Sequence, residues 1–481
     1  MLKAFQSIAL VLVAASVGSG AGITSFDTGY TITKVRSGQS KGTTFIAASS
    51  YEGTVLGMRL DGTIAWKNAL SGYMNHDLWC ADLTGDGIDE ILAANADGSV
   101  YCLNVRGETQ WQFKKNDVPM YSVCAVKNGD TPYIACGGFD MNMYYLDAKG
   151  KLISTVASST YSKQKAWDAE AGAPSNVHNV NFVRPFPTSD GKEKLMMAGF
   201  NNHMQEAGVL YEFDPLAVMP KSNKGVDIGG LKTLGDMHVC DTDGDGAGEI
   251  LFGTSQIIGD AALGIYDSKS DDYRSVDLSS LRRKIDRIRY HVLQPRVIPK
   301  GDSFEYLLLM GPAIVLLPPD LDVNKAEVLN SKYSYNDLWQ VTDTKFILAS
   351  SESGGSCIHL LDTSVDGWKN AYQNLEPVGN IAAIHARRAE LKAQVDRFKR
   401  PAYEVAGRPR PPVYFMSESL RSPAVASLAK RLESSSPRIQ FLGNKHTNKV
   451  QYPPSWNRDA VVTNEVYRKK RDSRHDYNDP K

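Results

Sequence analysis

The sequence lacks any apolar run long enough to cross a membrane, because its longest, residues 8–17, has ten residues where a bilayer needs about 20. It also lacks net charge, with 54 Lys and Arg against 54 Asp and Glu. With 42% hydrophobic and 22% charged residues, the composition excludes a wholly disordered chain, a collagen and a polytopic membrane protein. The 481 residues are therefore expected to form folded domains or one large repeat array.

Cysteine is scarce, and no two of the six cysteines have the CxxC spacing of zinc or redox sites. All six lie in apolar, strand-like segments, which favours buried free thiols. An alternative stays open for Cys124 and Cys136, which have the spacing to pair across one hairpin if the protein is exported to an oxidising compartment.

The N-terminus has the order of a secretory signal peptide. Lys3 precedes the apolar run 8–17, and Gly18, Ser19, Gly20 and Ala21 supply small residues for cleavage. We expect a signal peptide over residues 1–22 and a secreted or periplasmic protein without a membrane span in its mature chain. The alternative is an uncleaved N-terminal anchor.

An internal repeat dominates the next 350 residues. Residues 53–66 and 98–111 both place alternating residues, a glycine turn at Gly62 or Gly107, and a tryptophan at Trp66 or Trp111, 45 residues apart. Weaker copies occur at residues 143–147, 209–214, 263–267, 314–320 and 358–362. A short apolar strand precedes each of the seven copies, at residues 45–48, 91–94, 133–136, 195–198, 250–252, 306–309 and 346–349.

Seven units of several short strands each predict an all-β, seven-bladed β-propeller over residues 23–380, since one four-stranded sheet cannot bury both faces alone. A β-solenoid or a pair of sandwiches is the alternative. The chief helical pattern inside the repeats, residues 278–289, is interpreted as a surface insertion between the fifth and sixth units.

Two units contain an acidic loop, residues 82–90 and 241–249. In each, oxygen-bearing side chains at positions one, three, five and nine, and a glycine at six, are suited to wrapping a hard cation. We expect a structural calcium ion in each loop. The expected ligands are Asp82, Thr84, Asp86 and Glu90 in the first loop, and Asp241, Asp243, Asp245 and Glu249 in the second. The alternative is a polar turn without an ion.

The two D-x-x-G-D-G-x-x-E loops and the strands that follow them resemble FG-GAP or VCBS-type repeats, which occur in integrin-like propellers and in exported bacterial proteins. The Gly and Trp segments at 53–66 and 98–111 resemble those of PQQ-like, quinoprotein-type propellers. Quinone-dependent members of that group usually have eight blades and a dedicated cofactor pocket. Seven units and no recognisable cofactor ligands make PQQ unlikely as a cofactor here.

A polar or ionisable residue recurs at the start of each expected innermost strand. In a propeller these positions converge on the central channel, so we expect them to form a ligand site at its mouth. The expected ligand-binding residues are Asp77, His178, Asn179, His238, His291 and Asp337. Candidates for proton transfer are His178, His238, His291 and Tyr290. The alternative is a set of polar groups that line a water-filled channel and bond one another.

The C-terminal part differs in charge. From Arg387 onward there are 21 basic and 10 acidic residues, which leaves 33 basic and 44 acidic residues before it. We expect a helix at 381–400 and a basic segment at 401–481, which contains elements of an incomplete α/β domain. This segment has the charge to contact the acidic propeller or an anionic polysaccharide. Nucleic acid is not an expected partner of an exported protein.

These features lead to one main hypothesis: an exported, calcium-stabilised propeller that binds carbohydrate at its channel mouth. Export, tyrosine and tryptophan content, and analogy of fold support carbohydrate as the ligand. Two alternatives remain. One is a polysaccharide-degrading enzyme, a lyase or a glycoside hydrolase, that uses the channel-mouth histidines. The other is a scaffold for protein partners.

Overall fold

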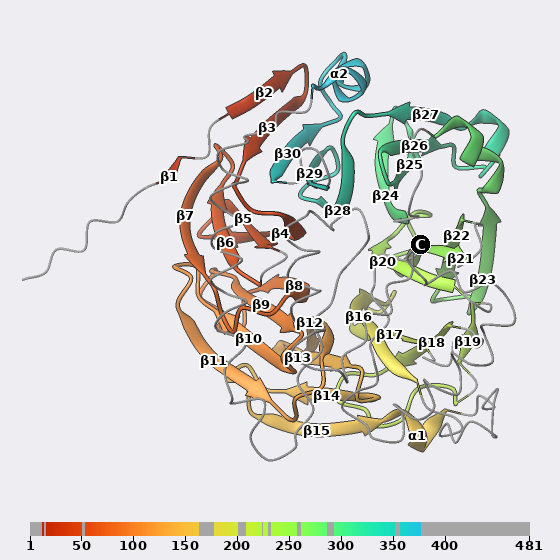
Figure 1. Ribbon diagram of the computed structural model, residues 1–481. Helices are drawn as coiled ribbons and strands as arrows, with labels where there is room; N and C mark the ends of the chain where they lie inside the picture. The colour runs from red at the N-terminus through yellow and green to blue at the C-terminus, as the bar shows by residue number, and fades with distance from the viewer. Residues whose placement is uncertain are drawn as a thin grey trace, which may run out of the picture.

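The structure is a ring of seven antiparallel β-sheets around a central axis (Figure 1). The computed structural model describes residues 12–13, 16–50, 53–162, 178–200, 208–223, 225–228, 232–256, 261–285, 293–351 and 356–376. The number of sheets confirms the predicted seven-bladed β-propeller. The expected helix at 381–400 and basic segment at 401–481 lie outside the described residues.

Each blade is a meander in which the first strand lies nearest the axis and the fourth lies at the rim. The first six blades are, in order, β4(Ile32–Ser40), β5(Thr43–Ser50), β6(Val55–Arg59), β7(Thr63–Asn68); β8(Asn75–Ala81), β9(Glu90–Asn95), β10(Ser99–Leu103), β11(Thr109–Lys114); β12(Met120–Asn128), β13(Thr131–Gly138), β14(Asn142–Leu146), β15(Leu152–Ala157); β16(Asn179–Pro187), β17(Glu193–Phe200), β18(Gly208–Phe213), β19(Val226–Asp227); β20(Lys232–Cys240), β21(Glu249–Gln256), β22(Ala261–Asp267), β23(Asp272–Asp277); and β24(Leu293–Lys300), β25(Ser303–Met310), β26(Ala313–Leu317), β27(Glu327–Asn330).

The seventh blade joins the two ends of the ring. Its inner strands β28(Ser334–Gln340), β29(Lys345–Ser351) and β30(Cys357–Asp362) come late in the chain, whereas its fourth strand is the N-terminal β3(Ile23–Asp27). Strand β3 pairs with β30 from Ile23 opposite Leu361 to Asp27 opposite Cys357. The ring is thus closed by hydrogen bonds between residues more than 300 positions apart.

Two further short strands come from the segment expected to be a signal peptide. Strand β2(Ser16–Gly20) pairs with the outer edge of β3, and β1(Leu12–Val13) pairs with β7 at the rim of the first blade. These two additions give the first and seventh blades five strands, while the other five blades have four.

The hydrophobic core lies between neighbouring blades, because each sheet is apolar on both faces. Ala47 and Val55 of the first blade, for example, pack against Leu78, Ile91 and Tyr101 of the second. The α-helix α2(Trp368–Asn374) packs with Trp368 and Tyr372 in the cluster between the sixth and seventh blades. Stacking of this kind is what makes a four-stranded unit stable only among its neighbours.

The repeated tryptophans and glycines join each blade to the next. Trp66, at the rim of the first blade, donates its indole N–H to the carbonyl of Val105 at 2.6 Å and lies against Gly107. Trp111 of the second blade repeats this arrangement with Ala148 and Gly150. At Gly107 φ is +79°, and an added Cβ would lie 2.3 Å from the Trp66 ring, so the turn needs glycine on both counts.

Three smaller expectations have outcomes in the fold. The helical pattern at 278–289 appears as a short 3-10 helix, η2(Ser279–Lys284), and residues 286–292 lie outside the described part. The second 3-10 helix and the remaining short helix are η3(Val323–Lys325) and α1(Ser158–Tyr161). All six cysteines are free thiols, as predicted; four of them are buried, whereas Cys80 and Cys240 are half-buried. None of the described helices is long and apolar enough to cross a membrane.

Candidate functional site

A bulge near the start of the inner strands sets the geometry of the hub. In six of the seven inner strands the pairing register shifts by one residue at the same place, for example between Asn75 and Asp77 in β8 and between Tyr335 and Asp337 in β28. In five of these strands the first residue after the shift lies at the hub, and in β20 it is Asp236, inside the shift between Leu234 and Met237; β24 pairs without a shift and contributes Gln294. The resulting layer contains, in blade order, Lys34, Asp77, Ser122, Phe182, Asp236, Gln294 and Asp337.

The residues two positions further along form a second layer that contains three arginines. Arg36, Arg184 and Arg296 come from the first, fourth and sixth blades, and their side chains are at most 2% exposed. Arginine buried this deeply is rarely tolerated without a paired charge. The aspartates of the first layer supply that charge.

Arg36 contacts all three aspartates of the hub. Its guanidinium lies 2.9 Å from Asp77, 3.4 Å from Asp236 and 3.0 Å from Asp337. Arg184 contacts the first two of these, with Nη1 2.8 Å from Asp77 and Nη2 2.9 Å from Asp236. The network therefore links five blades, the first, second, fourth, fifth and seventh, through charge-assisted hydrogen bonds.

Neutral donors complete the coordination of the carboxylates. The Ser122 hydroxyl donates to Asp77 at 2.7 Å, and the Gln294 amide donates to Asp337 at 2.7 Å. Asp337 also accepts from the backbone N–H of Val35 at 2.8 Å. A ligand hydroxyl could bond these carboxylates only by displacing protein donors that already hold them.

Two of the hub aspartates, Asp77 and Asp236, are ionised because the charges of the arginines outweigh the effect of burial. Burial alone would raise the pKa of Asp77, but the charges of Arg184 and Arg36 hold this pKa below its ordinary value. Burial would likewise raise the pKa of Asp236, but the charges of Arg184 and then Arg36 lower it. Asp77 and Asp236 are therefore negatively charged at neutral pH.

Arg296 differs from the other two arginines. It donates to the backbone carbonyls of Pro295 and Leu338, and among the described residues no carboxylate lies within ion-pair distance of it. Burial lowers the pKa of Arg296 to about 10. The neighbouring His238 is held neutral, since burial and the charge of Arg296 both lower its pKa well below the usual value.

Two tryptophans of the same layer meet beside these arginines. Trp79 of β8 and Trp339 of β28 contact edge to face, with ring centroids 5.9 Å apart. The Arg36 guanidinium lies 4.5 Å from the centre of the Trp339 ring, and the Trp339 indole donates to Ser37 at 2.9 Å. Ring stacking and cation–π contacts thus fill the axis next to the ion network.

The structure brings together some of the residues expected at the channel mouth. Asp77 and Asp337 share Arg36, and His238 lies one layer away beside Arg296. His178 lies elsewhere, stacked on Tyr211 with centroids 5.3 Å apart, and burial lowers its pKa to about 4. Asn179 is buried beside Asn181, and Tyr290 and His291 lie outside the described residues. A ligand-binding or catalytic role for any of these residues stays a prediction.

Sequence reasoning missed the arginines and Asp236. It found Asp77 and Asp337, but it picked His238 in the fifth blade, two residues after Asp236, and it did not consider the second layer, which holds the arginines. The available signal was the arginine itself, at Arg36, Arg184 and Arg296, because an arginine within an inner strand is buried and needs polar partners.

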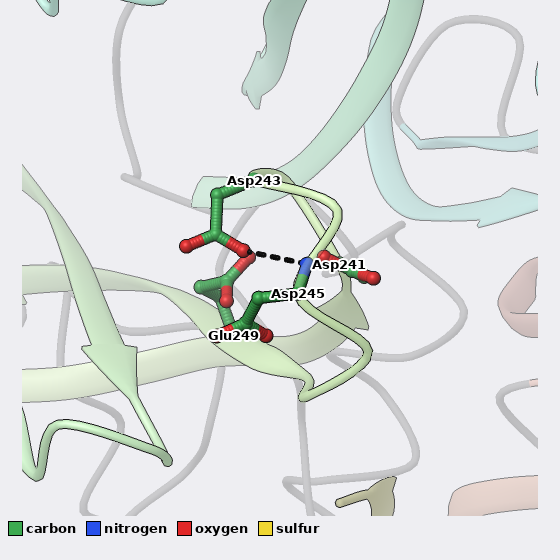
Figure 2. A group of neighbouring side chains, drawn as sticks. All are labelled: Asp241, Asp243, Asp245 and Glu249. Atoms are coloured by element: carbon green, nitrogen blue, oxygen red, sulfur yellow. Dashed lines mark hydrogen bonds between the residues drawn. The ribbon is translucent and has the colours of Figure 1, made fainter. Parts of the chain in front are cut away.

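The second acidic loop gathers four carboxylates. One oxygen from each of Asp241, Asp243, Asp245 and Glu249 lies within 4.8 Å of the others (Figure 2). Asp241 accepts from the backbone N–H groups of Gly244 and Gly246, which curls the loop. Glu249 is 5% exposed, and its Oε1 atom has no hydrogen-bond partner.

The first acidic loop is organised differently. Asp82 accepts four backbone N–H groups of its own loop, those of Thr84, Gly85, Asp86 and Gly87. Two further hydrogen bonds connect this loop to the first blade. The backbone N–H of Lys41 donates to the carbonyl of Gly87, and the backbone N–H of Gln39 donates to the Asp89 carboxylate. Among the described residues, the only group of three or more potential metal-ligating side chains is the one in the second loop.

The fold and hub together define the class: a closed seven-bladed β-propeller whose axis is filled by buried ion pairs. A comparison with protein-family models then assigns the family. Residues 45–361 match the model described as "Lambda-carrageenase beta-propeller domain", and the chain belongs to this family. The matching model is thus neither an FG-GAP or VCBS repeat nor a quinoprotein-type repeat, which the sequence resembles locally.

Two curated proteins are similar over nearly the whole chain. Both are named "Lambda-carrageenase"; one, from Pseudoalteromonas sp., is 41% identical over 461 residues, and the other, from Pseudoalteromonas carrageenovora, is 40% identical over the same length. These matches cover 95% of this chain and 48% of each relative. The chain thus spans about half the length of the curated relatives that it matches.

Two solved structures are similar at lower sequence identity. The β-propeller domain of Cps50 (Swd1) from Myceliophteria thermophila is 12% identical, with a TM-score of 0.47 over 73% of this chain and 99% of that chain. BBS1N, solved in complex with ARL6DN and soaked with mercury, is 9% identical, with a TM-score of 0.48 over 73% and 97% of the two chains.

Proposed function

We propose that this protein takes part in the degradation of a carrageenan, a sulfated galactan, outside the cell. The observation that carries the proposal is the similarity to lambda-carrageenases, about 40% identity along 95% of the chain, together with the family match over the propeller. This proposal favours the polysaccharide-degrading alternative of the sequence analysis over simple carbohydrate binding.

The chemistry of the substrate favours hydrolysis over elimination. A polysaccharide lyase removes the C5 proton of a uronic acid, whose carboxyl group makes that proton acidic. A sulfated galactan has no uronic acid, so cleavage of its glycosidic bond requires addition of water, with one new reducing end formed for each bond broken. The channel-mouth histidines therefore lose the role of abstracting a C5 proton in this proposal.

Incubation of the full chain with λ-carrageenan tests the proposal. We expect reducing ends to accumulate without absorbance at 235 nm, the signal of an unsaturated uronate. A matched incubation with polygalacturonate should yield neither signal. Folded protein that releases no reducing ends and does not bind λ-carrageenan would contradict the proposed function.

We further propose that the loop 241–249 binds a structural calcium ion. Support comes from the converging carboxylates of Figure 2 and from the unpartnered, buried Oε1 of Glu249, which has the chemistry of a hard-cation ligand. Burial first, and then the charges of Asp243 and Asp241, raise the pKa of Glu249, and a cation would relieve that repulsion. Lys269, 2.8 Å from Asp245, supplies only part of the compensating charge.

Chelation of calcium tests this loop. We expect EDTA to lower the melting temperature of the wild-type protein and to leave that of Asp245→Ala unchanged, because the variant has already lost the ion. Asp86→Ala, in the first loop, is the matched control and should keep the response to EDTA if the second loop is the site. A wild-type melting temperature indifferent to EDTA and to added calcium would contradict the assignment.

We also propose that residues 1–22 are removed during export. Without β1 and β2, the first and seventh blades lose their fifth strands, and all seven blades become four-stranded. The closing strand β3 begins at Ile23, directly after the small residues expected at the cleavage point. N-terminal sequencing of the exported protein should begin at or near Ile23; a start at Met1, or one that removes β3, would contradict the proposal.

A further inference from the structure

The two faces of the propeller carry different charge. Because the strands of a blade are antiparallel, the turns between first and second strands, and between third and fourth strands, lie on one face, which we call the hairpin face. The turns between second and third strands, and the links from one blade to the next, lie on the opposite face, the connection face.

The hairpin face is strongly acidic. The seven turns between first and second strands contain ten aspartates and two lysines: Asp82, Asp86, Asp89, Asp130, Asp190, Asp241, Asp243, Asp245, Asp302 and Asp343, against Lys41 and Lys192. The described turns between third and fourth strands are close to neutral, with seven acidic and six basic residues. The acidic excess therefore surrounds the end of the central axis on this face.

The connection face has the opposite balance in its described residues. Its turns and links contain five basic residues, Lys115, Arg282, Arg283, Lys284 and Lys332, and three acidic ones, Asp97, Asp117 and Asp140. A fourth acidic residue, Glu376, lies on this face after α2 and forms an ion pair with Lys332, so the basic excess rests on Lys115 and the residues of η2. Asp97 is 5% exposed and is bonded to Tyr101, so it contributes little to the outer field. Arg283 and Lys284, which end η2, have exposed side chains, as does Lys115 across the ring.

We propose that the connection face is the surface that binds the sulfated polysaccharide, with Arg283 and Lys284 among its sulfate contacts. This inference rests on the proposed function, because it is the sulfate esters that make the substrate a polyanion. Sulfate esters are ionised at every physiological pH, and the field of clustered like charges extends about 8 Å at physiological ionic strength. The hairpin face therefore repels a sulfated chain before contact, whereas the connection face attracts it.

The structure of the hub adds a second reason. The ion network closes the axis with side chains that are at most 2% exposed, apart from Lys34 at 4%, so a polysaccharide cannot pass from one face to the other. A polysaccharide bound at the connection face can therefore contact only residues of that face. The acidic hairpin face is suited to binding cations, in agreement with the calcium loop proposed there.

Affinity electrophoresis of the full chain through gels that contain λ-carrageenan tests the assignment. We expect Arg283→Glu/Lys284→Glu to weaken retardation by about fivefold or more in apparent Kd, since two exposed charges are reversed. Lys41→Glu/Lys192→Glu makes the same change in charge on the hairpin face, also at exposed side chains, and should alter the apparent Kd less than twofold. Added salt should reduce the difference between the two double variants.

The possible outcomes separate this inference from the proposed function. Wild-type protein that is not retarded by λ-carrageenan contradicts the proposed function itself. Retardation of the wild type that both double variants keep unchanged, or that the hairpin-face variant loses more strongly, overturns the connection-face assignment alone. Circular dichroism of each variant checks that the propeller is folded.

Discussion

Asp77 shows how one residue can hold several blades. It bonds two arginines and a serine from three other blades, so it acts at the centre of the ring although it is remote in sequence from all of them. A residue of this type has a structural explanation that does not depend on a ligand. Its polar character at the channel end was visible in the sequence, whereas its partners were not.

Removal of the Asp77 carboxylate should be costly. Asp77→Ala leaves Arg36 and Arg184 short of one counter-charge in a buried place, and we expect a loss of about 3–5 kcal/mol in the free energy of unfolding. Ser122→Ala removes a neutral donor to the same carboxylate and should cost about 1–2 kcal/mol. Urea denaturation of both variants measures the difference; equal, small losses would contradict a stabilising role for the ion network.

Buried neutral histidines should make stability depend on pH. His359 bonds Ser25 across the closing pair of strands, and burial lowers its pKa to about 3. His178 has a pKa of about 4 for the same reason. Because the unfolded chain takes up protons near pH 6.5 and the folded chain does not, stability is full above pH 6.5 and falls as the pH drops toward 4. The expected loss is up to about 1.4 kcal/mol per pH unit for each histidine.

The variant His359→Asn tests this pH dependence, since it keeps a polar group near Ser25 and removes the titrating ring. Unfolding free energies measured by urea between pH 7 and pH 4.5 should fall less steeply for the variant than for the wild type. An unchanged slope would show that His359 takes up no extra proton on unfolding.

At the scale of the strand and turn, the repeat motif serves the contact between blades. The Gly and Trp positions that made the repeat visible in the sequence are the positions where one blade meets the next, as Trp66 meets Gly107. This explains why the copies with both residues were the easiest to recognise. Repeat units that lack the Gly and Trp pair were harder to recognise in the sequence, although their strands are as regular.

Gly107→Ala should destabilise the propeller by about 2–4 kcal/mol, because the new methyl group would meet the Trp66 ring and the residue has a positive φ. Gly42 is the matched control: its φ is +80°, but nothing lies within 4 Å of an added Cβ. Gly42→Ala should therefore cost only the conformational part, about 1 kcal/mol. Thermal unfolding compares the two, and equal losses would exclude the contact between blades as the cause.

The closing strand gives a prediction for truncated chains. A protein that begins at Gly22 keeps β3 and its five residue pairs with β30, and should melt within a few degrees of the full chain. A protein that begins at Thr28 lacks β3, exposes the edge of β30, and should melt at least 10 °C lower or fail to fold, because the ring is open. Equal melting temperatures for the two truncated proteins would contradict closure by β3.

For the whole molecule, the sequence predicted the number of blades, their order and most second and third strands, since alternation and turn residues recur with each unit. It did not predict the hub network, because Arg36, Arg184 and Arg296 become neighbours of the aspartates only when the ring closes. The fourth strand of the last blade was equally hidden, as β3 lies far from β30 in the sequence. Periodicity and turn residues predict the strands of each blade. The hub ion pairs and the pairing of β3 with β30 join residues far apart in the sequence, and no local pattern indicates them.

The distribution of charge between the two faces is also a property of the whole molecule. The acidic excess was visible in the sequence, but its concentration on one face depends on which turns share that face. In our proposal the acidic hairpin face repels a polyanion and the basic connection face attracts it, so the propeller binds such a ligand with one face only. The assignment of the binding surface therefore requires that a sulfated galactan binds the connection face and does not bind the hairpin face.

Hydrogen–deuterium exchange with and without λ-carrageenan oligosaccharides measures this most directly. The account predicts slower exchange in turns of the connection face, such as residues 96–98, 139–141 and 331–333, and unchanged exchange in residues 82–89 and 241–248 of the hairpin face. Protection confined to the hairpin-face loops, with the connection face unaffected, would contradict it.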